Sequence, residues 1–86
     1  MYEIEYDHQL RETLNKLFKR DKKRYEICMK KIEEILASPE HYKPLRYDMK
    51  NRREVHIAKS FVLTFRIDGN IIRFLDLEHH DKIFRR

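Results

Sequence analysis

The hydrophobic residues of this chain change their spacing from a helical period to a strand period near residue 40. Leu10, Leu14, Leu17 and Phe18 recur at intervals of three and four, and a similar stripe continues through residue 36. From residue 53 onward apolar side chains alternate with polar ones, which is the period of a half-buried strand. Helices and strands are therefore segregated along the chain, which predicts the α+β fold class.

Two helices are predicted in the first half. Asp7 can cap a helix that runs to about Arg20. Asp21 restarts the pattern, and Ser38 with the proline that follows it ends the second helix. Because the two helices are joined almost directly, they should form a hairpin.

Strands are predicted on both sides of this hairpin. Residues 2–6 alternate as an N-terminal strand, and residues 40–44 read as a loop. A probable strand at 45–49, a turn at 50–52 and strands at 53–58, 61–67 and 71–78 then form an antiparallel meander of three or four strands. Asp68-Gly69-Asn70 is a strong hairpin turn. We expect the helices to cover one sheet face and the other face, which carries much of the Arg and His, to stay partly open.

Length and composition restrict the function. Eighty-six residues predict one domain, 1–86. The single Cys28 excludes a disulfide framework or a Cys-rich zinc site, and its place on the helical stripe predicts a buried small hydrophobe. No apolar run approaches the roughly 20 residues of a membrane span, and the first residues do not resemble a signal peptide. We therefore expect a cytoplasmic protein that needs no metal or other cofactor.

The positive charge is concentrated in the second half. Residues 1–40 hold nine cationic and nine acidic side chains, whereas residues 41–86 hold eleven and six, and seven of those eleven are Arg. Small basic proteins are common, but a segregated, Arg-rich excess favours a partner such as nucleic acid.

The last strand leads directly into a tail that contains His79, His80, Asp81, Arg85 and Arg86. Imidazole exchanges a proton near neutral pH, and guanidinium matches the geometry of phosphate. These groups are what a small ribonuclease without a metal would need.

Two stretches carry a resemblance to a known family. Residues 53–67, REVHIAKSFVLTFRI, contain a basic residue, a His-Ile pair, a short turn, an aromatic residue and a Leu-x-Phe-x-Ile strand. The ending His80-Asp81-Lys82-Ile83-Phe84 is similar to a closing His-x-x-Leu/Ile-Phe/Tyr motif. With the order of elements, both resemble the RelE/ParE superfamily of type II toxin–antitoxin toxins, and most closely the RelE-like and YafQ-like mRNA interferases.

The resemblance implies endonucleolytic cleavage of mRNA, usually in the ribosomal A site. It also implies an antitoxin partner of the RelB/DinJ kind, with which such toxins commonly bind operator DNA. The reaction needs a base, an acid and positive charge at the phosphate, and no metal, because the RNA supplies its own 2′-hydroxyl nucleophile.

The resemblance also assigns roles to individual residues. His80 is the first candidate for the general acid or base, His56 is the second, and Arg85 is the expected phosphate clamp, with Arg66 as a further source of charge. The residues expected to contact RNA are Arg46, Lys50, Arg52, Arg53, His79 and Phe84. Two positions depart from the family pattern: Ser60 replaces the aspartate of YafQ-like toxins, and Val62 replaces the arginine of the RelE-like branch.

Other readings of the same residues stay open. Adjacent histidines can be a surface accident or, less favourably, part of a metal site, His56 can be a structural strand histidine, and Arg85 can belong to a solvated terminus. A ParE-like inhibitor of DNA gyrase shares the fold and hydrolyses nothing. An inactive corepressor with the toxin fold is a third reading, because Ser60 and Val62 depart from the pattern.

Overall fold

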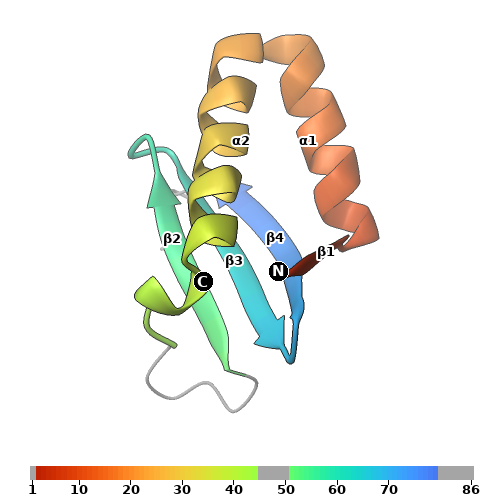
Figure 1. Cartoon of the computed structure of the whole chain (residues 1–86). Helices are drawn as coiled ribbons and strands as arrows, with labels where there is room; N and C mark the ends of the chain where they lie inside the picture. Colours follow the sequence, from red (N-terminus) through yellow and green to blue (C-terminus); the bar gives the residue numbers. More distant parts are fainter. Residues whose placement is uncertain (1, 45–50, 80–86) are drawn as a thin grey trace.

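The computed structural model describes residues 2–44 and 51–79 (Figure 1). Along the chain these residues form β1 (Glu3–Tyr6), α1 (His8–Arg20), α2 (Lys22–Ala37), a 3₁₀ turn (Pro39–His41), β2 (Arg52–Ile57), β3 (Phe61–Asp68) and β4 (Ile71–His79). The α+β class and the helical hairpin are confirmed. The predicted strand at 45–49 lies outside the described residues.

The four strands form one mixed sheet in the order β1-β4-β3-β2. The meander is confirmed, because β2 pairs antiparallel with β3 and β3 with β4. β1 pairs parallel with β4 and makes β4 a central strand, which agrees with the apolar residues on both of its faces. Figure 1 shows α1 and α2 together on one face of this sheet.

Each helix begins directly after an aspartate that caps it, which was predicted for Asp7 and is observed for Asp21 as well. The Asp7 carboxylate accepts a hydrogen bond from the Gln9 amide at 3.0 Å, and the Asp21 carboxylate accepts one from the Arg24 amide at 3.1 Å. Asp21 therefore ends α1 and caps α2 without an intervening loop, which explains why the two helices turn back on one another so tightly.

The core lies between the helical hairpin and the sheet. Cys28 is buried as predicted, at 1% exposure, and burial raises the pKa of its thiol to about 11. Tyr6 of β1 stacks on Phe74 of β4 with 5.5 Å between ring centroids. The buried residues of this cluster are Leu10, Leu14, Cys28, Ile32, Ile35, Val55, Ile57, Leu63, Phe65, Ile72, Phe74 and Leu77.

Both predicted boundaries of β2 were wrong by one residue. Arg52, placed in a turn, is the first residue of β2, and Ala58, placed at the end of the same strand, belongs to the following turn. Ala58 and Lys59 both have positive φ, 52° and 60°, and the Ser60 amide donates to the Ile57 carbonyl at 3.1 Å. Both central residues of this tight hairpin turn are left-handed, a conformation that normally selects Gly or Asn and that periodicity does not reveal.

Candidate functional site

The sheet face opposite the helices carries three rows of side chains that cross the strands. Val55, Ile57, Leu63 and Phe65 point into the core, so their alternate neighbours on β2 and β3 lie on the other face. The register then aligns Arg52 with Arg66 and Arg73, Glu54 with Thr64 and Asp76, and His56 with Val62 and Glu78. We call these the arginine row, the middle row and the histidine row.

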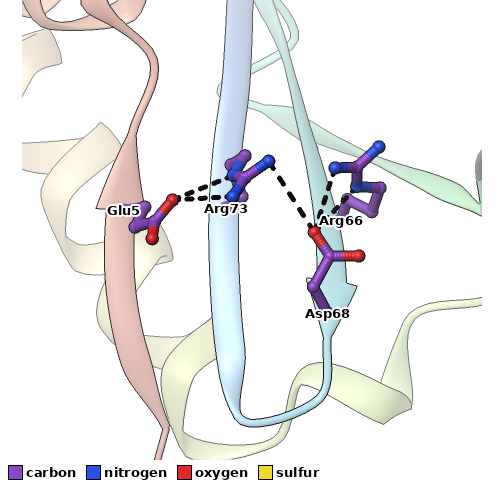
Figure 2. Close-up of polar contacts among 4 residues, drawn as sticks. All are labelled: Glu5, Arg66, Asp68 and Arg73. Carbon is purple, nitrogen blue, oxygen red and sulfur yellow. Dashed lines mark hydrogen bonds and ion pairs between the residues drawn. The ribbon is translucent and has the colours of Figure 1, made fainter.

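The arginine row is held in place by two carboxylates (Figure 2). Glu5 Oε1 lies 3.0 Å from Arg73 Nε and 2.9 Å from Arg73 Nη2. Asp68 Oδ2 lies 3.0 Å from both Nε and Nη2 of Arg66, and 3.9 Å from Arg73 Nη1. The network ties β1, β4 and β3 together and orients two guanidiniums. Arg73 was not among the predicted site residues, although its place in the alternation of the strand is the signal that could have found it.

The histidine row contains a predicted catalytic residue. His56 is exposed on β2 and pairs across the ladder with Val62, which is only 1% exposed. A buried valine offers no charge at the position where the RelE-like branch has arginine. The strained turn at Ala58 and Lys59 follows His56 by two residues, and backbone strain of this kind clusters at functional sites.

Arg66 and His56 lie in different rows of this face. Arg66 is four residues along β3 from Val62, the ladder partner of His56. At a rise of about 3.3 Å per residue, the backbones of the two rows are about 13 Å apart. The Arg66 guanidinium is held by Asp68, which lies further along β3 from the histidine row.

Arg53 makes hydrogen bonds to the main chain that the sequence did not predict. Its Nη1 donates to the Tyr42 carbonyl at 2.6 Å and to the Pro39 carbonyl at 3.3 Å. The side chain is half-buried on the helix-facing side of β2, where it anchors the segment after α2. Its alternation with Arg52 predicts this inward direction, but its charge suggested an RNA contact.

Five of the predicted site residues lie outside the described residues: His80, Arg85, Phe84, Arg46 and Lys50. His79 is the last residue of β4 and pairs with Phe61, so β4 ends at the end of the sheet that carries the histidine row. Within residues 2–44 and 51–79, no three His, Cys, Asp or Glu side chains gather as metal ligands.

A groove of about 250 Å³ lies between the helices and β1. Its lining residues are Tyr6, Arg11, Leu14, Asn15, Tyr25 and Met29. Burial raises the pKa of the Tyr6 phenol at this groove above its usual value. Neither described helix is long and apolar enough to cross a membrane.

A segregated α+β chain with a helical hairpin on one face of a small mixed sheet is the architecture of small bacterial toxins of known structure. A crystal structure of a metal-bound toxin from Helicobacter pylori matches with a TM-score of 0.75 at 24% identity, over 98% of this chain and all of that chain. The Escherichia coli DinJ–YafQ complex matches with a TM-score of 0.71 at 21% identity, over 98% of this chain and 99% of that chain. These similarities establish the fold.

Sequence comparison establishes the family. A protein of Methanocaldococcus jannaschii named "Putative toxin RelE4" is 48% identical over 88 aligned residues, which cover all of this chain and 94% of that protein. An uncharacterized protein of Methanosarcina mazei is 41% identical over 98% of this chain and its own full length. No family model matches the chain. The chain belongs to the RelE family of toxins, as the two sequence motifs indicated.

Proposed function

We propose that this toxin cleaves mRNA bound to the ribosome and thereby inhibits translation. The observation that carries the proposal is the sheet face left uncovered by the helices, where the arginine row and His56 share one surface. Three guanidiniums lie in one row of this face and the His56 imidazole lies in another. Because Glu54 and Asp76 lie between these rows, an RNA strand would meet the face through its phosphates at the arginine row and through the reacting group near His56.

The proposed reaction is an in-line transfer at phosphorus. A base removes the proton of the ribose 2′-hydroxyl, the 2′-oxygen attacks the adjacent phosphorus, and the bond to the 5′-oxygen breaks. An acid gives a proton to the departing 5′-oxygen, so the products are a 2′,3′-cyclic phosphate and a 5′-hydroxyl. We assign His80 as the first candidate and His56 as the second for these transfers, and Arg85 as the group that neutralises the non-bridging oxygens.

The arginine row has a different part in this proposal. Because it lies about 13 Å from the histidine row, Arg66, Arg52 and Arg73 would hold neighbouring phosphates of the same strand rather than the one that reacts. Arg46, Lys50, His79 and Phe84 remain proposed RNA contacts. For Arg53 the hydrogen bonds to Pro39 and Tyr42 support an anchoring role instead.

A cognate antitoxin is the proposed protein partner. DinJ is bound to YafQ in two of the crystal structures that match this chain, which supports a complex of the same kind here. We propose that an antitoxin helix places apolar side chains in the groove between Tyr6, Leu14 and Met29, and that the complex binds operator DNA. Asn15→Trp should fill the groove and weaken antitoxin binding, whereas Lys16→Trp, one residue along and outside the groove lining, should not.

Cell-free translation separates this proposal from gyrase inhibition. We expect the chain to stop protein synthesis from a preformed mRNA template. This synthesis requires the cytoplasmic machinery of ribosome and message but no gyrase. Unchanged synthesis together with a loss of DNA supercoiling by purified gyrase would favour the ParE-like alternative instead.

A further inference from the structure

The junction between α1 and α2 concentrates the positive charge of the first half of the chain. Residues 16–24 hold six of the nine cations of residues 1–40 and only one of the nine carboxylates, so this segment carries +5 and the rest of that half carries −5. Residues 1–40 therefore have no net charge, but their positive and negative side chains are strongly separated along the chain. All six cations are exposed in the structure: Lys16, Lys19, Arg20, Lys22, Lys23 and Arg24.

Three of these cations oppose the local electrostatics of their helix. Lys22, Lys23 and Arg24 occupy the first turn of α2, which contains no acidic residue. The amino end of a helix is partially positive, so cations there reduce helix stability, whereas Lys19 and Arg20 at the carboxyl end of α1 are favourable. Arg24 has a local partner, because its Nε lies 3.3 Å from Asp21 Oδ2, but the two lysines beside it still break the local rule, which is typical of a surface selected for binding.

An aromatic side chain lies exposed among these cations. Phe18 is 47% exposed, although large apolar side chains of α1 otherwise face the core. Its ring meets Tyr25 edge-to-face, with 5.0 Å between centroids, and Lys22 Nζ lies 5.7 Å from the Phe18 centroid. The contacts orient the ring while its exposed part remains accessible to a partner.

We propose that this tip of the helical hairpin binds structured RNA, with the cations on phosphates and Phe18 stacked on an unpaired base. Proteins that recognise RNA loops combine exposed cations, which bind phosphates, with an aromatic side chain, on which an unstacked loop base can stack. The choice of RNA among polyanions rests on the proposed function, and ribosomal RNA is the structured RNA that a toxin acting on ribosomes would meet.

The tip is separate from the surface proposed for cleavage. Figure 1 shows the α1–α2 junction at the end of the molecule opposite the β3–β4 turn, and the helices cover the sheet face opposite the arginine and histidine rows. The tip would therefore hold the ribosome while the open sheet face receives the message. Loss of the tip should weaken ribosome binding without altering the cleavage chemistry.

Binding to RNA that cannot be cleaved tests the tip independently of catalysis. The probe is a labelled 2′-O-methyl RNA hairpin with an unpaired loop, which lacks the nucleophile of the proposed reaction. The variant pair Lys22→Gln with Lys23→Gln should weaken binding several-fold and reduce the slope of log affinity against log salt by about two. The matched pair Lys30→Gln with Lys31→Gln removes the same charge two turns along α2 and should reduce that slope much less.

Phe18 is tested by comparing the hairpin with a blunt 2′-O-methyl duplex. Phe18→Leu keeps an apolar contact for Tyr25 but removes the ring face, so it should weaken hairpin binding about fivefold or more and leave duplex binding unchanged. Circular dichroism establishes that each variant folds. Equal salt slopes for the two lysine pairs would overturn the proposal, and so would tip variants that bind the hairpin as tightly as the wild type does. Tip variants that lose antitoxin binding but keep RNA binding would also overturn it. A folded chain that binds the hairpin through the tip but cuts no message would refute only the nuclease.

Discussion

Arg53 offers the sharpest separation of a structural role from an RNA-binding one. Its Nη1 donates to two main-chain carbonyls, those of Tyr42 at 2.6 Å and Pro39 at 3.3 Å, in a half-buried position. A hydrogen bond from a charged donor contributes about 1.5–3 kcal/mol, and its removal leaves the acceptors unsatisfied. Because the second bond is long and the site is only half-buried, we expect Arg53→Ala to lower the free energy of unfolding by about 2 kcal/mol.

Thermal unfolding measures this change directly. For a domain of this size, 2 kcal/mol corresponds to a fall in Tm of about 10 °C. Arg52→Ala is the matched control, because it removes the same side chain one residue away at an exposed position on the other face, where the loss of stability should be clearly smaller than about 2 kcal/mol. RNA affinity should follow the opposite order, with the larger loss in Arg52→Ala. An unchanged Tm in Arg53→Ala, with RNA binding reduced as much as in the control, would refute the anchoring role.

Three further predictions concern the fold. Burial raises the pKa of Cys28 from 9.0 to about 11, so the folded state keeps this proton above the pH at which the unfolded state releases it. Urea titrations should therefore show the free energy of unfolding falling between pH 9 and pH 11. Cys28→Ala should flatten this decline, and an equal slope in the variant would contradict the prediction. Glu5→Gln should destabilise the protein by at most about 1 kcal/mol, an effect that high salt removes, because Glu5 and Arg73 are both substantially exposed. Ala58→Gly should raise stability by up to about 1 kcal/mol, because glycine adopts the φ of 52° without strain; a lower Tm would contradict this.

The sequence predicted the fold better than it predicted the contacts of individual side chains. Period and capping residues located both helices, since Asp7, Asp21 and Ser38 act through near neighbours in the chain. The parallel pairing of β1 with β4 was not predicted, because it joins segments almost seventy residues apart and no local signal specifies the neighbour of an N-terminal strand. The left-handed turn at Ala58 and Lys59 was missed because neither residue type favours positive φ.

The candidate site was predicted by residue type, and the structure adds which groups share a surface. Alternation on β2 distinguishes the exposed Arg52 and His56 from the inward Arg53, but a charge count treats both arginines alike. The strand register then separates Arg66 from His56, a spacing that cannot be read from either strand alone. Arg73 becomes a candidate site residue only through its alignment with Arg66 and its contact with Glu5.

The most direct test of the central claim is to map new RNA 3′ ends on ribosomes stalled on a defined message. We predict cuts at a fixed position relative to the A site with the wild-type chain. His80→Ala should slow cleavage by about two orders of magnitude, and Arg85→Ala should raise the barrier by about 2–4 kcal/mol. His56→Ala tests the second proton-transfer candidate in the same experiment. No cuts by the folded wild-type chain, or undiminished cuts by all three variants, would contradict the account.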